Sequence, residues 1–276
     1  MKPPLSVIIG VVPDLRSIAS RQNPLVKELR RAFQQAEPTP DGFLAIEGVQ
    51  LIEEAIRSGL RLRTVFVSQS AQPRAARLLP QLSRHVEVVL LPDAMFSGAV
   101  ATESPQGVAA MVAAPQHSLD AVLGVANPLA VVAAGLQDPG NLGTIIRSAE
   151  AFGAAAVLCG EGTVSAFNAK VIRASAGSLF RLPVFRMKDD ELIAALRRFH
   201  LRLLATSSHK GTPLPKADLR GPVALVIGNE GAGVPRSFAR AVDAHLAIPH
   251  SERVESLNAA IAASILLYES SRQRHL

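Results

Sequence analysis

Hydrophobic and polar positions follow two patterns over the first 114 residues, one typical of helices and one typical of strands. Segments with apolar residues on one helical face predict helices, and short apolar runs rich in β-branched and aromatic residues predict strands. The predicted helices cover residues 23–35, 49–59 and 73–84. The predicted strands cover residues 42–48, 62–69, 85–92 and 107–114. The alternation indicates a compact α/β unit of about 100 residues.

The pattern is interrupted between residues 115 and 128, where Pro, His, Ser, Gly and Asn separate two apolar runs. We place a linker there, with room for one helical turn. Strands and helices then alternate again, which implies a parallel sheet covered on both faces. The predicted strands cover residues 129–136, 155–160, 179–185, 201–207, 223–228 and 244–249. The predicted helices start near Leu142, Asn168, Asp189, Pro235 and Ser256. The expected organisation is an extension (1–15), a first domain (16–114), the linker (115–128) and a second domain (129–276).

Composition indicates a folded globular protein, because 48% of the 276 residues are hydrophobic and 19% are charged. No apolar run reaches the roughly 20 residues that span a bilayer. The apolar patch at residues 7–12 is too short for a signal peptide, so we expect a tail or a first strand there. The single Cys159 excludes an internal disulfide, and no Cys/His cluster has zinc-site spacing. We therefore expect no metal and a cytoplasmic location.

The formal charge of +6 is unevenly distributed. Residues 127–276 carry 17 Lys and Arg against 12 Asp and Glu, whereas residues 1–126 carry 12 against 11. Two basic clusters are evident, one formed by Arg16, Arg21, Lys27, Arg30 and Arg31, the other by Lys170, Arg173, Arg181 and Arg186. Charge alone leaves a nucleic-acid partner and a solvated surface equally open. Few aromatic residues are present, which argues against extensive base stacking.

Three loops follow predicted strands and carry candidate chemistry: "DPGNLGTIIRSAEAFG" (138–153), "VIGNEGAGV" (226–234) and "IPHSERVESLN" (248–258). In an open parallel sheet, ligands bind outside the carboxyl ends of strands. The first loop is not a dinucleotide fingerprint, because two residues rather than one separate Gly140 from Gly143, and no Lys-Ser/Thr pair follows as in a P-loop. It offers instead the side-chain amide of Asn141 and the guanidinium of Arg147, which suits a phosphate.

Each of these polar residues also has a purely structural interpretation. Asn141 could be a helix N-cap and Arg147 a surface helix residue. Glu230 could cap the helix that follows its glycine-rich turn. Ser256 and Asn258 could mark the start of the last helix.

The three loops together resemble the SpoU/TrmH family of RNA ribose 2′-O-methyltransferases, within the SPOUT superfamily. The first family motif is matched by Asn141, Gly143, Arg147, Ala149, Phe152 and Gly153. The second is matched by Gly228, Glu230 and Gly233, and the third by Ile248, Pro249, Ser256, Leu257 and Asn258. The resemblance covers residues 129–270, and residues 21–59 resemble the family's N-terminal L30e-like domain, which binds substrate RNA.

The resemblance implies a C-terminal parallel-sheet domain with a trefoil knot, S-adenosylmethionine as methyl donor, a ribose 2′-hydroxyl as acceptor, no metal, and a homodimer. The implied catalytic residues are Arg147, Asn141, Glu230, Ser256 and Asn258. The implied cofactor-binding residues are Thr206, Gly228, Ile248 and Leu257. RNA phosphates would contact Arg21, Lys27, Arg30, Arg31, Lys170 and Arg173.

One stretch departs from the family pattern. Family members commonly carry Met and a Gly between Ile-Pro and Ser-Leu-Asn, where this chain has His250, Ser251, Glu252 and Arg253. Loss of the glycine is expected to stiffen the loop, so the departure affects the detailed geometry of the loop and not the family. We expect ribosomal RNA, specifically 23S rRNA, as substrate; the alternatives are transfer RNA, a catalytically silent RNA-binding dimer, and a Rossmann-type enzyme with a nucleotide at residues 138–143.

Overall fold

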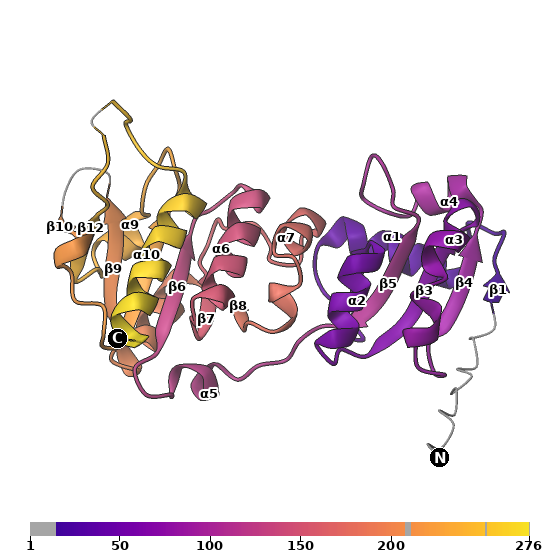
Figure 1. Cartoon of the computed structure of the whole chain (residues 1–276), viewed down its shortest axis with the longest axis horizontal. Coiled ribbons are helices and arrows are strands. Elements are labelled where there is room, and N and C mark those ends of the chain that lie inside the picture. Colours follow the sequence, from indigo (N-terminus) through magenta and orange to yellow (C-terminus); the bar gives the residue numbers. More distant parts are fainter. Residues whose placement is uncertain (1–14, 208–210, 252, 276) are drawn as a thin grey trace, which may run out of the picture. The chain divides into compact units, whose positions relative to one another are not determined.

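The chain forms two compact units that divide between Ala114 and Pro115. The structure is a computed structural model that describes residues 15–207, 211–251 and 253–275 (Figure 1). The predicted extension therefore lies outside the described residues, except that Leu15 begins the first strand. Each unit has its own sheet and its own core, so each is described separately.

The N-terminal unit is built on a five-stranded mixed sheet of order β1-β4-β3-β5-β2. The strands are β1 (Leu15–Ser17), β2 (Phe43–Glu47), β3 (Leu62–Ser68), β4 (Glu87–Leu91) and β5 (Val108–Ala113). Strands β1, β4 and β3 are parallel, whereas β5 runs antiparallel to β3 and β2. Strand β5 is therefore the last strand of the unit in sequence, but it lies inside the sheet, between β3 and β2.

The helices of this unit follow the local sequence signals in two places and depart from them in one. Helix α1 (Pro24–Gln35) starts where Asn23 Oδ1 accepts a 3.0 Å hydrogen bond from the Leu25 amide, and α2 (Val49–Arg57) ends before Gly59, whose φ is 73°. The predicted helix at 73–84 is wrong. It is reduced to α3 (Gln72–Ala75) and a 3₁₀ turn around Pro80, because proline removes a backbone donor and disfavours helix before it. A short α4 (Asp93–Ser97) follows β4.

The C-terminal unit is built on a seven-stranded sheet of order β10-β12-β9-β11-β6-β7-β8, in which every neighbouring pair is parallel. The strands are β6 (Leu129–Ala134), β7 (Ala156–Cys159), β8 (Val184–Arg186), β9 (Arg202–Ser207), β10 (Thr212–Pro213), β11 (Val223–Gly228) and β12 (Ala244–Ala247). All residues of β6 and β11 are buried, as expected of central strands in a covered parallel sheet. The predicted α/β class with a parallel C-terminal sheet is confirmed; the trefoil knot stays a prediction from the family.

Helices cover this sheet and connect its strands: α5 (Leu119–Leu123), α6 (Pro139–Ala151), α7 (Ala169–Ala174), α8 (Asp189–Arg198), α9 (Arg236–Ala239) and α10 (Ala259–His275). Leu192 and Leu196 of α8 and Phe238 of α9 pack in one cluster with Ala130 and Val132 of β6. Helices α6 and α10 lie side by side (Figure 1), joined by a 2.7 Å hydrogen bond between the hydroxyls of two serines, Ser148 and Ser264.

Two edge strands differ from the sequence predictions. The predicted strand at 179–185 is mostly wrong, since a 3₁₀ helix (Ser178–Phe180) precedes Pro183 and only β8 extends beyond it. The two-residue β10 was not predicted. Both lie at the sheet edges, where pairing on one side only leaves a weak signal in the sequence.

Candidate active site

Three strands that end at the same edge of the sheet bring the three sequence motifs together. Strands β6 and β11 are parallel neighbours, and β9 separates β11 from β12. The segments that follow β6, β11 and β12 carry Asn141, Glu230 and Asn258, with Asn141 in the first turn of α6. Because parallel strands end at one edge of the sheet, these side chains meet although up to 117 positions separate them.

The three side chains form one hydrogen-bonded cluster, which we call the amide cluster. Nδ2 of Asn141 donates to Glu230 Oε1 at 2.9 Å, and Nδ2 of Asn258 donates to the same oxygen at 2.7 Å and to Asn141 Oδ1 at 2.9 Å. The Ala259 amide, at the first residue of α10, also donates to Glu230 Oε1 at 3.1 Å. A single carboxylate oxygen therefore fixes both amide side chains and the start of a helix.

Asn258 also caps the last helix. Its Oδ1 accepts from the amides of Ala260 and Ile261 at 3.0 and 3.2 Å, so α10 begins at Ala259 rather than at Ser256. The structural interpretation of Asn258 is correct, and it is compatible with a role in the cluster because the cap uses Oδ1 and the cluster uses Nδ2. Glu230 caps α10, not the helix that directly follows its own turn.

A tight turn presents Glu230. Asn229 and Gly233 exchange backbone hydrogen bonds of 2.9 and 2.8 Å, and Oδ1 of Asn229 accepts from the amides of Gly231 and Ala232. A Cβ on Gly228 would lie 2.5 Å from the backbone of Gly233, so only glycine fits at the end of β11. Asn229 was not predicted as a site residue; its signal in the sequence is an Asn followed by Gly two residues later, which is typical of an Asx turn.

The first motif starts its helix differently from the prediction. Helix α6 begins at Pro139, and Asp138 is its N-cap, with Oδ1 accepting from the Asn141 amide at 2.7 Å. The predicted start near Leu142 and the interpretation of Asn141 as a cap are therefore wrong. A Cβ on Gly143 would lie 2.5 Å from Ala174 Cβ and 2.6 Å from the Val171 carbonyl oxygen, so this glycine allows α6 to pack against α7.

Arg147 does not join the amide cluster. It is exposed on α6, six residues beyond Asn141, which corresponds to about 9 Å along the helix axis. Among the residues that the structure describes, no hydrogen bond or ion pair involves its side chain. Its guanidinium is therefore available to an external anion.

The four residues predicted to bind a cofactor line one pocket at the ends of β9, β11 and β12. These residues are Thr206, Gly228, Ile248 and Leu257. Glu230 and Ser256 line the same pocket, so it adjoins the amide cluster. Ile227 and Leu246 add apolar walls, and His250 closes one side with its Nδ1 2.7 Å from the Ile248 carbonyl oxygen. The arrangement of apolar walls around strand-end backbone suits a flat heterocycle such as adenine.

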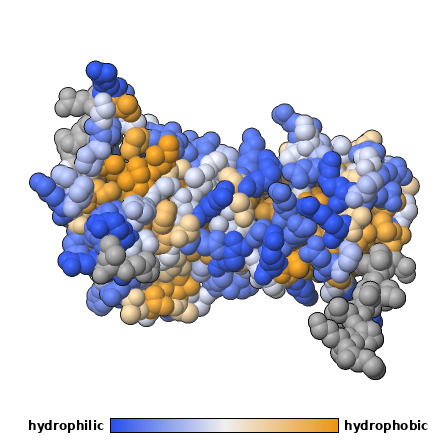
Figure 2. Space-filling view, viewed as in Figure 1, coloured by the Kyte–Doolittle hydropathy of each residue, from blue (hydrophilic) through white to orange (hydrophobic). Residues whose placement is uncertain are grey.

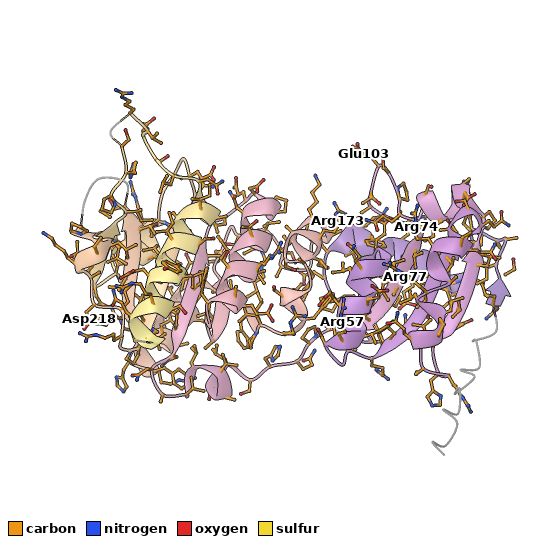
Figure 3. The ribbon with its side chains drawn as sticks, in the orientation of Figure 1. Arg57, Arg74, Arg77, Glu103, Arg173 and Asp218 are labelled. Atoms are coloured by element: carbon orange, nitrogen blue, oxygen red, sulfur yellow. The ribbon has the colours of Figure 1, made fainter. Side chains whose placement is uncertain are left out.

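The predicted RNA-binding residues lie on or just before two helices, one in each unit. Arg21 precedes α1 and is exposed, as are Lys27 and Arg31 on it. Arg30 is half-buried and donates through Nε to the Gly98 carbonyl oxygen at 2.9 Å. The other helix, α7, exposes Lys170 and Arg173, and Arg173 is labelled in Figure 3. Within its sequence cluster, Arg181 is held by Glu150, with its Nε and Nη2 2.5 and 3.0 Å from the carboxylate oxygens.

Within the described residues, no group of three His, Cys, Asp or Glu side chains is placed to hold a metal ion, and no helix is long and apolar enough to cross a membrane. Burial raises the pKa of the Cys159 thiol to about 12, so this thiol is protonated and is not a nucleophile at neutral pH.

Comparison with known proteins decides the family. The model of the SpoU rRNA methylase family matches residues 128–268, and that of an MRM3-like substrate binding domain matches residues 23–110. The chain belongs to the SpoU rRNA methylase family. The family expected from the three motifs is thereby confirmed.

Relatives of this SpoU methylase match it over nearly its whole length. It is 34% identical to the 23S rRNA (guanosine(2553)-2′-O)-methyltransferase RlmP of Bacillus subtilis, over 92% of this chain and 98% of that protein. It is 31% identical to the 23S rRNA (uridine(2479)-2′-O)-methyltransferase of Streptomyces viridochromogenes, over 95% and 94%. The crystal structure of an AdoMet-bound rRNA methyltransferase from Sinorhizobium meliloti has a TM-score of 0.79 and 29% identity, covering 95% and 98% of the two chains.

Proposed function

We propose that this SpoU methylase transfers a methyl group from S-adenosylmethionine to a ribose 2′-hydroxyl of 23S ribosomal RNA. The named activities of its relatives support the reaction and the substrate class. The observation that carries the proposal is the position of Glu230, which belongs to the amide cluster and also lines the pocket. A group bound in the pocket therefore lies beside a rigid set of amide side chains.

The pocket residues fit S-adenosylmethionine. Ile248 and Leu257 provide apolar contacts for the adenine faces, and Gly228 lines the pocket with strand-end backbone. When bound, the cofactor supplies a methyl group on a positively charged sulfur, which needs no metal for activation. The main task left to the chain is to orient the ribose and to ease loss of the hydroxyl proton.

Arg147, Asn141, Ser256 and Asn258 are the residues that we assign to the ribose. The guanidinium of Arg147, which has no partner among the described residues, binds the phosphate next to the target nucleotide and stabilises negative charge on the 2′-oxygen. Asn141 and Asn258 are held by Glu230, so their amides need little reorganisation when substrate arrives. Ser256 lines the same pocket as Glu230.

A second copy of the chain covers the exposed face of α6 and α10 in this proposal. Ile261 and Tyr268 of α10 are 54% and 56% exposed, and Tyr268 makes an edge-to-face ring contact of 5.8 Å with Phe152. Figure 2 shows hydrophobic side chains gathered over the first turns of α10. Arg147 is on the exposed side of the neighbouring α6, so a homodimer through this face places Arg147 close to the partner.

The exposed cations extend the substrate contact. Lys170 and Arg173 of α7 bind RNA phosphates near the reacting ribose, and Arg21, Lys27, Arg30 and Arg31 bind phosphates from the N-terminal unit. Ribosomal RNA as substrate implies a cytoplasmic location.

Isothermal titration calorimetry with S-adenosylmethionine tests the pocket assignment. We expect saturable binding by the wild-type chain and a loss of at least tenfold in affinity for Gly228→Ala, whose Cβ would collide with the Gly233 backbone. Gly221→Ala is the matched control, since its nearest atom lies 3.9 Å away. Absence of any binding by the wild type would refute the methyltransferase proposal and leave an RNA-binding protein.

A further inference from the structure

A second pocket lies in the N-terminal unit, where four strand ends meet at one edge of its sheet. Strand β2 ends at Glu47 and β3 at Ser68, β4 ends at Leu91, and the antiparallel β5 begins at Val108. The side chains that line the pocket include Ser68, Ser70, Arg74, Asp93, Phe96 and Gln106. None of the three sequence motifs contributes to it.

A buried carboxylate outside the pocket holds the loop that contributes Gln106 to its lining. Glu47 is only 5% exposed, and its Oε1 accepts a 2.7 Å hydrogen bond from the Gln106 amide, while its Oε2 accepts from the Thr102 hydroxyl. Burying a carboxylate is costly unless hydrogen bonds satisfy it. Glu47 therefore fastens the loop between α4 and β5 over the strand ends, and Glu103 stands at the tip of this loop (Figure 3).

Two glycines keep the pocket walls close together. A Cβ on Gly107 would lie 2.4 Å from Ala71 Cβ and 2.7 Å from the Ser68 hydroxyl. A Cβ on Gly48 would lie 2.6 Å from Oε1 of Gln106. The loop between α4 and β5 is therefore packed closely against the edge of the sheet, which fixes the positions of its polar groups.

The pocket presents an anionic acceptor and a cationic donor. Asp93 Oδ1 accepts from the amide and the hydroxyl of Ser70 at 3.0 and 2.8 Å, and these bonds, the amide first, hold the pKa of Asp93 below its ordinary value. The Ser68 side chain also contacts this carboxylate, and a carboxylate has about four acceptor sites, so Asp93 keeps acceptor capacity for a ligand. Arg74 donates to the Gln106 carbonyl oxygen.

Arg74 differs from the arginines around it in charge balance. Arg57 is paired with Glu54 at 2.7 Å and Arg77 with Glu53 at 3.3 Å, whereas Arg74 has no acidic partner within the described part of the chain. A backbone carbonyl orients its guanidinium without neutralising it. All three arginines are labelled in Figure 3.

We propose that this pocket binds one unpaired nucleotide of the substrate RNA, with its phosphate on Arg74 and an N–H group of its base edge on Asp93. A bare anion does not fit, because Asp93 would repel it, and a single carboxylate is too few ligands for a metal ion. An unpaired nucleotide carries both the negative charge and the exposed base donors that the pocket complements. The inference deepens the proposed function and rests on it, since it assumes an RNA substrate.

The test measures RNA binding without cofactor, by filter binding of the full chain to a 23S rRNA transcript made in vitro. Arg74→Ala and Asp93→Asn are expected to raise Kd at least fivefold, and Gln106→Ala to weaken binding as a second pocket variant. Arg77→Ala is the matched control, because that arginine is already paired, and its Kd is expected to stay within twofold. Arg74→Ala should also make the salt dependence of log Kd less steep by about one ion.

Asp93→Asn distinguishes recognition of an unpaired base by Asp93 from a general effect of charge on RNA binding. If Asp93 were only a surface charge, its removal would strengthen binding of a polyanion, whereas the proposal requires weaker binding. A fully paired RNA duplex offers no unpaired base, so Asp93→Asn should bind it at least as tightly as the wild type does. Binding by Asp93→Asn as tight as by the wild type, or equal losses for Arg74→Ala and Arg77→Ala, would overturn the inference.

Methyl transfer is measured separately, with the same transcript at saturating concentration. Because the variants act on binding, kcat should stay within twofold of the wild-type value. A wild type that binds RNA but transfers no methyl group would refute the proposed function and leave the pocket test intact. Thermal unfolding of each variant shows whether it is folded.

Discussion

Oε1 of Glu230 accepts a 2.7 Å hydrogen bond from Nδ2 of Asn258, 28 positions further along the chain. The same oxygen accepts from Asn141, 89 positions before it. The glycine-rich turn after β11 is thereby tied to the helix that follows β6 and to the helix that follows β12. These hydrogen bonds imply that the amide cluster contributes to the stability of the C-terminal unit as well as to the candidate active site.

Asn258→Ala removes the amide of the cluster and the cap of α10 together. Loss of an N-cap costs about 1 kcal/mol, which corresponds to a fall of about 2–4 °C in Tm for a domain of this size. We expect such a fall, with at least a tenfold loss in kcat/KM. Ser256→Ala, which removes no hydrogen bond among the described residues, is the control for Tm. An unchanged Tm in Asn258→Ala would show that the cap is not needed.

Gly143→Ala tests the packing of α6 on α7. Alanine is favoured over glycine in a helix by about 1 kcal/mol, but the added Cβ would lie 2.5 Å from Ala174 Cβ. We expect net destabilisation of about 1–3 kcal/mol, the range for overpacked cores, measured by urea unfolding. Gly140→Ala in the same helix meets only the Asp138 carboxylate, at 3.0 Å, and should cost less. Equal effects of the two substitutions would contradict the assigned role.

Arg147→Ala is expected to lower kcat by about 100- to 1,000-fold, as for removal of one transition-state donor. Its Kd for S-adenosylmethionine should not change, because Arg147 does not line the pocket. Radiolabelled methyl transfer and calorimetry measure the two quantities. Arg240→Ala, another exposed arginine of the C-terminal unit, is the control. Wild-type activity in Arg147→Ala would exclude its assignment to the ribose.

The Asp243–Arg197 pair gives the C-terminal unit an acid-sensitive contact. Both Asp243 oxygens accept from Arg197, at 2.7 and 2.9 Å, and one also accepts from the Leu203 amide; the Arg197 bonds chiefly hold the pKa of Asp243 below its ordinary value. A lowered pKa stabilises the fold above the unfolded-state pKa of about 3.9, and the contribution is lost as pH falls through the folded-state value.

Asp243→Asn should therefore lower Tm at pH 7, and the difference from the wild type should shrink below pH 4. Thermal unfolding between pH 7 and pH 3 measures the difference. Glu161→Gln, an exposed residue of the same unit, should show no such trend. A difference between Asp243→Asn and wild type that is constant with pH would show that ionisation of Asp243 does not matter.

The sequence predicted the elements better than the contacts. The periodicity of residues 23–35 and the apolar run at 223–228 identify α1 and β11 correctly, since local spacing encodes which face is buried. The start of α6 was misplaced although Asp138-Pro139 is a typical cap followed by proline. The two-residue β10 forms through pairing with β12 and leaves no periodic pattern.

The site was predictable only through the family motifs. Nothing in the spacing of Asn141, Glu230 and Asn258 shows that they share hydrogen bonds, because the sheet order that joins them is a tertiary property. The sequence left open whether Asn258 caps the last helix or belongs to the site. It does both, because its Oδ1 caps α10 and its Nδ2 joins the amide cluster. The pocket of the N-terminal unit could not be predicted because its residues come from three separate stretches of the chain, 68–74, 93–97 and 105–107.

Position-resolved methyl transfer tests the central claim most directly. The chain is incubated with labelled S-adenosylmethionine and total RNA from a strain that lacks the gene, and the label is then mapped. We expect label in 23S rRNA at one nucleotide, with the adjacent phosphodiester resistant to alkali because its ribose 2′-oxygen is methylated. Label on a base, label only in transfer RNA, or no label at all would contradict it.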